Sequence, residues 1–263
     1  MKSYSGKQLD NMRASGKILR GAFELLENNI RAGVTTLELD KIAEKFIRSR
    51  GGEPCFKNYN GYGFTICASV NEASIHGIPR KDKILKDGDI ISIDCGVRYP
   101  KGRNGMCTDA ARTFAIGKIS NEARKLIETC ENCFEVATKN LKAGDKVSVI
   151  GEKIEALIGG RYGIIDTYFG HGIGEKVHED PLIPNFDVRK AILYGDKREK
   201  LLKLVDIELA QNTAICIEPM INCGTKKVKT AKDGWTVITE DGRLAAHYEN
   251  TLIIHKDGIE IVT

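Results

Sequence analysis

Two stretches of this chain decide its fold: Leu85-Lys86-Asp87-Gly88-Asp89-Ile90-Ile91-Ser92-Ile93-Asp94 and Leu209-Ala210-Gln211-Asn212-Thr213-Ala214-Ile215-Cys216-Ile217-Glu218. Each begins with a leucine, continues through a turn containing Gly or Asn, which tolerate positive φ, and then forms an apolar strand that ends on a carboxylate. The offset between them is 124 residues throughout (209 − 85). The repeat predicts two related halves, each of which delivers an acid to a shared centre.

Helical and strand patterns alternate in groups around these stretches. Amphipathic helices are predicted at 7–29 and 36–49, and Thr35 with Glu38 has the spacing of a capping box before the second one. The remaining predicted elements are strands near 63–69, 89–98 and 109–117, helices from Ser120 to about Lys142 and from Val147 to about Ile158, a charged helical stretch at 187–208, and strands at 214–221 and 248–255. This order predicts an α+β fold, and because no linker interrupts it we expect one catalytic domain over residues 1–263.

The composition limits the cellular locations and the binding partners that we expect for this protein. The first residues have no apolar core, and no later stretch approaches the roughly 18 apolar residues of a membrane span, so a cytoplasmic protein without membrane contact is expected. The eight cysteines are scattered, which predicts reduced, buried thiols, and Cys130 and Cys133 lie in a helical pattern that favours core packing over a metal site. Basic residues gather at 189–203 and 226–229 and could contact RNA, although a solvated surface explains them as well.

Four acids are the candidates for chemistry. Asp94 and Glu218 end apolar strands, where a carboxylate is costly to bury unless it is paired or binds a metal. Each is followed by a second acid in a strand-like context, Asp109 and Glu249. One such acid alone is usually a salt-bridge partner or a helix cap, but two per half suit a site in which carboxylates bridge two metal ions.

The histidines divide into two groups. His171 lies in Phe169-Gly170-His171-Gly172-Ile173-Gly174, where the glycines let the backbone approach a ligand closely, and His178 follows shortly after. His76 precedes Gly77-Ile78-Pro79. His247 and His255 have no comparable setting, and we expect both to be non-catalytic.

Together these segments resemble the type I methionine aminopeptidases, which are pita-bread metallopeptidases. The resemblance spans nearly the whole chain and is carried by His76-Gly77-Ile78-Pro79, Ile93-Asp94, Thr108-Asp109 with Arg112-Thr113-Phe114, Gly170-His171-Gly172-Ile173-Gly174, Ile217-Glu218-Pro219-Met220, Trp235 and Tyr248-Glu249. It implies a pita-bread fold, in which a curved, mainly antiparallel sheet of two pseudo-symmetric halves is flanked by helices.

The resemblance also implies roles for the candidate residues. Asp94 would chelate one ion, His171 and Glu218 the other, and Asp109 and Glu249 would bridge the two. Four carboxylates and one imidazole suit Mn²⁺, Fe²⁺, Co²⁺ or catalytic Zn²⁺. A bridging water, acidified toward pH 7, would then attack the carbonyl after the first residue.

Three further roles follow from the resemblance. Glu218 would also shuttle a proton, His178 would steady the carbonyl oxygen, and His76 would contact the scissile amide.

The methionine pocket implied by the resemblance consists of Tyr59, Tyr62, Cys67 and Trp235. Phe56 stands where the family commonly has a smaller residue, and Val177 where it has an aromatic one. Residues 99–105 lengthen the connection between Asp94 and Asp109, and the tip of a hairpin can absorb that length. The segment 187–208 resembles an insertion that could overhang the substrate entrance, and Gln211-Asn212 replaces the family's Pro-Gly turn.

The function implied is removal of the N-terminal methionine from nascent proteins and peptides whose second residue is small, by a monomer. A proline-directed peptidase or prolidase of the same fold is one alternative. We expect such relatives to carry a large extra N-terminal domain, and to lack the His76 motif and Trp235 together. The second alternative is an inactive pita-bread protein that binds RNA or the ribosome, but such a protein has no use for intact metal ligands.

Overall fold

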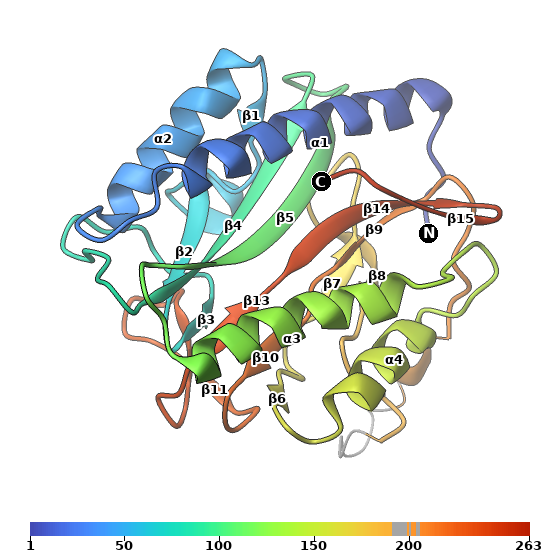
Figure 1. The fold of residues 1–263 in the computed structure, drawn as a ribbon. Helices are drawn as coiled ribbons and strands as arrows, with labels where there is room; N and C mark the ends of the chain where they lie inside the picture. The colour runs from blue at the N-terminus through green and yellow to red at the C-terminus, as the bar shows by residue number, and fades with distance from the viewer. Residues whose placement is uncertain (191–198, 200, 204–205) are drawn as a thin grey trace.

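The computed structural model describes residues 1–190, 199, 201–203 and 206–263, which form helices around a large curled sheet (Figure 1). The helices are α1 (Gly6–Glu27), α2 (Thr36–Ser49), α3 (Asn121–Thr138) and α4 (Ser148–Ile158), with a 3₁₀ turn η1 at Tyr59–Gly61. The strands are β1 (Glu53–Pro54), β2 (Ile66–Val70), β3 (Ala73–Ile75), β4 (Ile90–Tyr99), β5 (Met106–Ala115), β6 (Gly163–Ile164), β7 (Gly170–Gly172), β8 (Glu179–Ile183), β9 (Ala214–Ile217), β10 (Met220–Asn222), β11 (Val228–Thr230), β12 (Val237–Thr239), β13 (Ala245–His247), β14 (Glu249–His255) and β15 (Gly258–Ile261).

The main sheet has nine antiparallel strands with the order β1-β4-β5-β14-β9-β7-β8, and β2 and β15 pair with β4 and β14. Its centre, β4-β5-β14-β9, is symmetric in sequence: each half of the chain contributes one inner and one outer strand. The inner strands β5 and β14 meet through Glu249↔Ala111 and Asn250↔Ala110. The two predicted repeats therefore form the outer strands β4 and β9 of this symmetric group.

The helix ends follow their sequence signals. Thr35 accepts a hydrogen bond from the amide of Glu38, whose side chain accepts one from the amide of Thr35, so the predicted capping box is confirmed. Ser120 caps α3 through the amide of Ala123. Gly159 ends α4 in the left-handed region at φ 54°, where glycine costs least.

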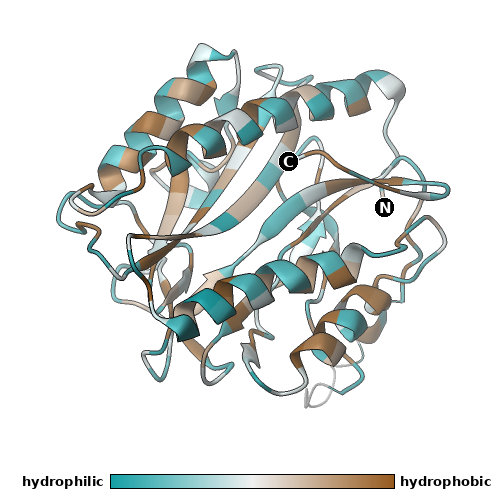
Figure 2. Ribbon diagram, viewed as in Figure 1, coloured by the Kyte–Doolittle hydropathy of each residue, from teal (hydrophilic) through white to brown (hydrophobic). Residues whose placement is uncertain are grey.

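Each pair of helices covers its own half of the sheet. Buried residues of α1 and α2, such as Leu19 and Leu39, pack with β2, β4 and β5, while those of α3 and α4, such as Leu126 and Ile154, pack with β9 and β14. In Figure 1, α1 and α3 cross the same face of the sheet, and Figure 2 shows the alternation of polar and apolar residues along them that this one-sided packing requires. The opposite face of the sheet remains for the site.

Some boundaries differ from the prediction. The strand predicted at 214–221 is interrupted after Ile217, because Pro219 has no amide hydrogen to donate, and it resumes as β10. Helix α3 ends at Thr138, before Lys142. Of the segment 187–208, residues 191–198, 200 and 204–205 lie outside the described residues, so the predicted insertion and helix stay predictions.

Two other expectations are confirmed. Cys130 and Cys133 are buried on α3, where the Cys130 thiol donates to the carbonyl of Pro219 at 3.2 Å. The lengthened connection at 99–105 forms the tip of the β4–β5 hairpin, while the strands stay in register around Gly96↔Asp109.

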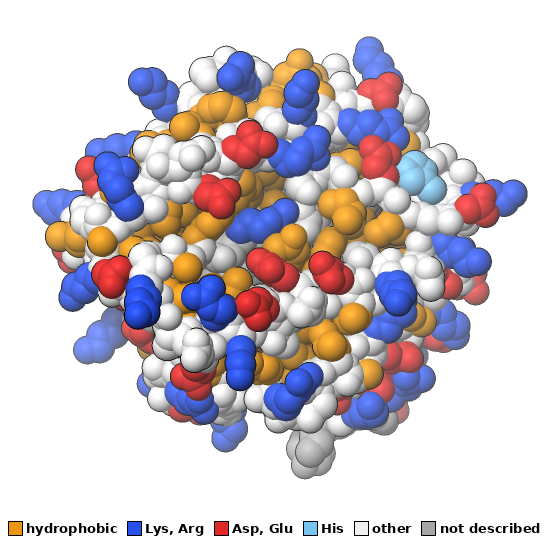
Figure 3. Space-filling view, in the orientation of Figure 1, with side chains coloured by type: hydrophobic (Ala, Val, Ile, Leu, Met, Phe, Trp, Pro, Cys, Tyr) orange, Lys and Arg blue, Asp and Glu red, His pale blue; other side chains and the backbone are white. Residues whose placement is uncertain are grey.

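The helical face of the molecule carries charges of both signs. Figure 3 shows Lys and Arg side chains interspersed with Asp and Glu over the helical face. None of the described helices has both the length and the apolar character that a membrane crossing requires.

Candidate metal centre

The four acids converge because the sheet is symmetric. Asp94 lies on β4, Asp109 on β5, Glu249 on β14, and Glu218 directly follows β9. Asp94 and Glu249 both have Ala111 as their cross-strand neighbour. Side chains opposite one another point to the same face of a sheet, and the small methyl group of Ala111 leaves room between the two carboxylates for a cation.

Hydrogen bonds hold the two inner strands together beside these acids. The amide of Asp109 donates to Thr251 Oγ1 at 2.8 Å, and the Thr251 hydroxyl donates to the carbonyl of Asp109 at 2.9 Å. The Arg112 guanidinium donates to the carbonyl of Glu249 and to Asn250 Oδ1. The spacing of Asp109 and Glu249 is therefore fixed by the backbone of both halves.

Without bound cations, the ionised forms of these four acids are unfavourable. Burial, followed by the charge of Glu249, raises the pKa of Asp94 to about 8. Burial first, and neighbouring carboxylates second, hold the pKa values of Asp109, Glu218 and Glu249 well above their usual range. Asp94 Oδ1 and Glu249 Oε1 are buried and have no hydrogen-bond partner among the described residues. Such orphaned oxygens fit bound cations.

His171 points an unprotonated nitrogen at this cluster. Its Nδ1 lies 3.0 Å from the carbonyl of Gly172, which can only accept, so Nδ1 carries the proton. Its Nε2 lies 3.6 Å from Glu218 Oε1 and 3.9 Å from Glu249 Oε1. Burial lowers the pKa of His171 to about 3, so the ring is neutral and suited to ligation.

The glycines around His171 are required by close packing of β7. A Cβ on Gly170 would lie 2.4 Å from the carbonyl oxygen of Cys216, and one on Gly172 would lie 2.2 Å from that of Asp180. Both contacts are with backbone atoms of neighbouring strands, which cannot rotate away. The predicted close backbone approach is therefore an approach to neighbouring strands.

Gly172→Ala is expected to lower the free energy of unfolding by about 2–3 kcal/mol, because β7 or β8 must shift to admit the methyl group. Urea denaturation of the metal-free protein measures this loss. Gly258→Ala is the matched control, because a Cβ there meets nothing within 4 Å. Equal stability of the two variants would contradict this explanation of the glycines.

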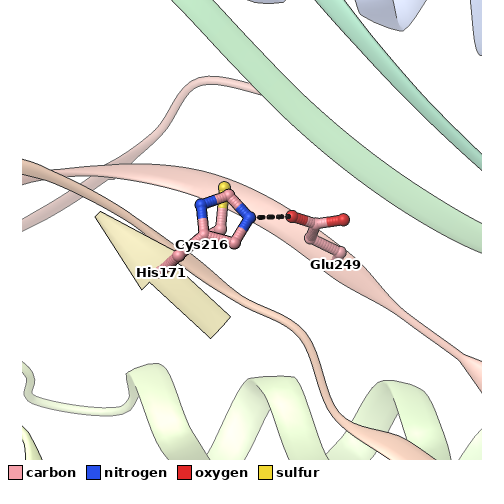
Figure 4. A group of neighbouring side chains, drawn as sticks. All are labelled: His171, Cys216 and Glu249. Atoms are coloured by element: carbon pink, nitrogen blue, oxygen red, sulfur yellow. Dashed lines mark ion pairs between the residues drawn. The ribbon is translucent and has the colours of Figure 1, made fainter. Parts of the chain in front are cut away.

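Cys216 lies beside the proposed metal ligands His171 and Glu249, but its thiol is not suited to bind metal (Figure 4). His171, Cys216 and Glu249 form one group whose candidate ligand atoms lie within 4.8 Å of one another. Burial, aided by the nearby carboxylates, raises the pKa of the Cys216 thiol well above its usual range, and the thiol lies 3.4 Å from Thr251 Oγ1. Because a thiol binds metal as thiolate, the protonated Cys216 acts as packing.

A second group of three ligands consists of Asp94, Asp109 and Glu249, again within 4.8 Å. Glu249 belongs to this group and to the group with His171 and Cys216. Glu218 also faces His171 Nε2, with its Oε1 at 3.6 Å. The donor set built from the predicted ligands is therefore mostly carboxylate oxygen with the imidazole nitrogen of His171, which fits the divalent ions from Mn²⁺ to Zn²⁺. The chemistry of these residues thus fits bound metal.

A cavity of about 310 Å³ opens beside these ligands. The predicted pocket and catalytic residues outside the ligand set all line it: Tyr59, Tyr62, Cys67, His76, His178 and Trp235. Phe56 lines it as well, whereas Val177 packs behind the wall with Phe56, Tyr62 and Cys67. The cavity therefore joins an apolar pocket to the cluster of acids.

Two histidines are held at its walls. The Tyr59 hydroxyl lies 2.9 Å from His178 Nδ1, and the His178 ring meets the His171 ring edge-on with centroids 4.4 Å apart. His76 adopts φ 57°, a conformation that is costly outside glycine. Burial lowers the pKa of His76 to about 4, so its ring is neutral at neutral pH.

The structure also brings in His247, which the sequence analysis had set aside as having no special setting. Its Nε2 lies 3.4 Å from Glu218 Oε2, and with Glu218 and Glu249 it forms a third group within 4.8 Å. One feature of the sequence could have indicated this: His247 lies two residues before Glu249, and residues two apart in an extended chain face the same side. His255 pairs with Glu260 at 3.1 Å, and its non-catalytic assignment stays a prediction.

Known proteins resemble the chain along its whole length. The model of metallopeptidase family M24 matches residues 10–256. The chain is 42% identical to the methionine aminopeptidase of Clostridium acetobutylicum, over 97% of this chain and 96% of that protein, and 39% identical to methionine aminopeptidase 1 of Bacillus subtilis, over 98% and 96%. The crystal structure of methionine aminopeptidase from Thermotoga maritima superposes with a TM-score of 0.90 at 31% identity, covering 100% of this chain and 99% of that one.

These likenesses confirm both the curled half-barrel of the pita-bread fold and the family that the motifs indicated. The chain therefore belongs to metallopeptidase family M24, among its methionine aminopeptidases.

Proposed function

We propose that the chain removes N-terminal methionine with two divalent metal ions, held by the acids on the symmetric strands and by His171. The relatives at 42% and 39% identity are methionine aminopeptidases, and M24 enzymes are metallopeptidases. The observation that supports a site for more than one ion is that Glu249 belongs to three groups of candidate ligands, one with His171, one with Glu218, and one with Asp94 and Asp109. Mn²⁺, Fe²⁺, Co²⁺ and Zn²⁺ all suit this donor set.

Each ligand has a proposed place. Asp94 would hold one ion, His171 and Glu218 would hold the other, and Asp109 and Glu249 would contribute oxygens to the centre. Bound divalent ions would supply Lewis-acid activation of a water and of the carbonyl of the first residue. Oxygen ligands on three strands, with Glu218 directly after a fourth, keep these positions fixed before substrate arrives, which is the preorganisation that catalysis needs.

Three side chains handle the substrate around this centre. Glu218 takes the proton of the attacking water and delivers it to the leaving amine. His178, oriented by the Tyr59 hydroxyl, donates Nε2–H to the substrate carbonyl oxygen, and neutral His76 contacts the scissile amide. The free α-amino group binds beside the acids, so the enzyme acts only at chain ends.

The apolar end of the cavity receives the methionine side chain. Tyr62 and Trp235 meet edge-on with ring centroids 5.1 Å apart, and Cys67 completes the wall. A flexible thioether packs well against aromatic edges and sulfur. Tyr59 packs against the same apolar cluster. The second residue of the preferred substrate is small.

We further propose that residues 1–263 work as one catalytic unit and as a monomer, on nascent chains in the cytoplasm. Both halves contribute ligands to the same centre, which supports a single unit. The basic strand β11 and the residues before it, Lys226 and Lys227, offer a surface for contact with the ribosome.

Peptide hydrolysis tests this function. Metal-free protein is given Mn²⁺, Fe²⁺, Co²⁺ or Zn²⁺ and then Met-Ala-Ser, Leu-Ala-Ser or Ala-Pro-Ser. We expect metal-dependent methionine release, with kcat/KM at least about tenfold above that for leucine, because the pocket contacts differ by 1–3 kcal/mol. Cleavage only before proline would point to a proline-directed peptidase, and no cleavage with any of the metals would favour a binding protein.

A further inference from the structure

His247 is the one histidine at the centre for which the proposed function has no role. It ends β13 opposite Met220 of β10, and only 2% of the residue is exposed. Its backbone is fixed, since its amide donates to Thr113 Oγ1 at 3.1 Å and its carbonyl accepts from the same hydroxyl at 3.0 Å. The backbone thus presents the ring to the acids in a defined position.

The ring itself has unsatisfied nitrogens. Neither Nδ1 nor Nε2 of His247 has a hydrogen-bond partner among the described residues. Leaving both buried nitrogens unpaired is costly, so the site must supply a partner when it is complete. Glu218 Oε2 is an acceptor that lies 3.4 Å from Nε2.

The carboxylate of Glu218 therefore lies between two imidazoles. Its Oε1 faces His171 Nε2 at 3.6 Å and its Oε2 faces His247 Nε2 at 3.4 Å. The Glu218 backbone is also held, because Asn185 Nδ2 donates to its carbonyl at 2.9 Å. Only rotation of the carboxylate remains to be fixed, and His247 is the group placed to fix it.

The cavity distinguishes the two imidazoles. His171 and Glu218 line it, whereas His247 is not among the described residues that do. His247 stands behind Glu218, where it can touch the carboxylate but not the substrate. A neutral imidazole has one N–H to donate.

We propose that His247 is a positioning residue, which donates Nε2–H to Glu218 Oε2 and so keeps Glu218 Oε1 turned toward His171. This inference rests on the proposed function, because it assumes that Glu218 is a metal ligand. Groups that orient ligands in this way typically change metal affinity 10–100-fold when they are lost.

Two amide variants test it. The Nε2 of glutamine can occupy the place of the imidazole Nε2, whereas the Nδ2 of asparagine corresponds to Nδ1 and falls short of Glu218. Calorimetric titration of metal-free protein with Mn²⁺ should give near wild-type affinity for His247→Gln and about 10–100-fold weaker binding for His247→Asn. His255→Gln, at the exposed end of β14, should leave the affinity unchanged.

The outcomes separate this inference from the proposed function. Wild-type affinity in His247→Asn, or equal losses in both variants, would overturn the positioning role while leaving the metal centre in place. If His247→Asn does not fold, the affinity of His247→Gln decides alone: retention supports the role and loss refutes it. A wild type that binds no Mn²⁺, Co²⁺, Fe²⁺ or Zn²⁺ would overturn both proposals.

Discussion

Asp109→Ala is expected to lower kcat for methionine release from Met-Ala-Ser by at least about 10³-fold at saturating metal. Asp109 lies on an inner strand of the sheet, and its carboxylate has an oxygen within 4.8 Å of carboxylate oxygens of both Asp94 and Glu249. Removing it takes away one of the five side chains that would hold the ions. A loss of roughly 4 kcal/mol in transition-state stabilisation corresponds to this factor.

Steady-state kinetics with metal titrated to saturation measure the effect and separate weaker metal binding from lost chemistry. Asp10→Ala is the matched control, because Asp10 is exposed on α1 and pairs only with Arg13 on its own helix among the described residues. The proposed ligand set fails if Asp109→Ala retains more than about a tenth of the wild-type kcat, which is less than 1.4 kcal/mol.

The metal-free protein should melt at a lower temperature at pH 8 than at pH 5. Burial raises the pKa of Asp94 from 3.8 to about 8, and those of Asp109, Glu218 and Glu249 shift in the same direction. The unfolded chain therefore releases these protons near pH 4, while the folded chain keeps them. Stability from these groups is complete below pH 4 and falls as the pH rises toward 8.

Divalent ions should reverse this loss, because they stabilise the ionised acids. With free metal at 100 times Kd, one ion adds about 2.7 kcal/mol, which raises the melting temperature by about 5–10 °C at this chain length. The gain should be larger at pH 8 than at pH 5, since protons compete with metal for the ligands. Calorimetric melting of wild type and Asp94→Asn, with and without Mn²⁺, measures both effects.

Asp94→Asn should show a smaller difference between pH 5 and pH 8 than the wild type, because one of the titrating acids is gone. A metal-free wild type that is more stable at pH 8 than at pH 5 would show that the buried acids do not dominate its pH dependence.

Local signals made most of the fold predictable from sequence. The capping box at Thr35 and Glu38 sets the start of α2, and the apolar run ending at Asp94 identifies β4. Tertiary contacts decide the remainder. β7 is only Gly170–Gly172, and its residues have no strand propensity of their own, so neighbouring strands impose the extended conformation.

The site was predictable where residue type and spacing coincide. Asp94 and Glu218 stood out because a carboxylate ends each repeat, and the Gly-rich setting of His171 marked it out. His247 carried no motif of its own, and its role depends on β13 placing it beside Glu218, which follows a strand some thirty positions earlier in the chain. Proximity of this kind arises from folding and not from local sequence.

The two halves of the main sheet pair through only two residue pairs between β5 and β14, Glu249↔Ala111 and Asn250↔Ala110, here called the seam. The register of this seam limits where residues can be added to or lost from the chain. Insertions at 99–105 extend the tip of an outer hairpin and leave the pairing of Gly96 with Asp109 intact. A slip of one residue at the seam would instead turn Glu249 to the helical face of the sheet and remove it from its groups of ligands. Insertions and deletions should therefore accumulate at the hairpin tips in related proteins. The number of residues from Asp109 to Ala111 should stay constant, and so should the pairing of Ala111 with Glu249.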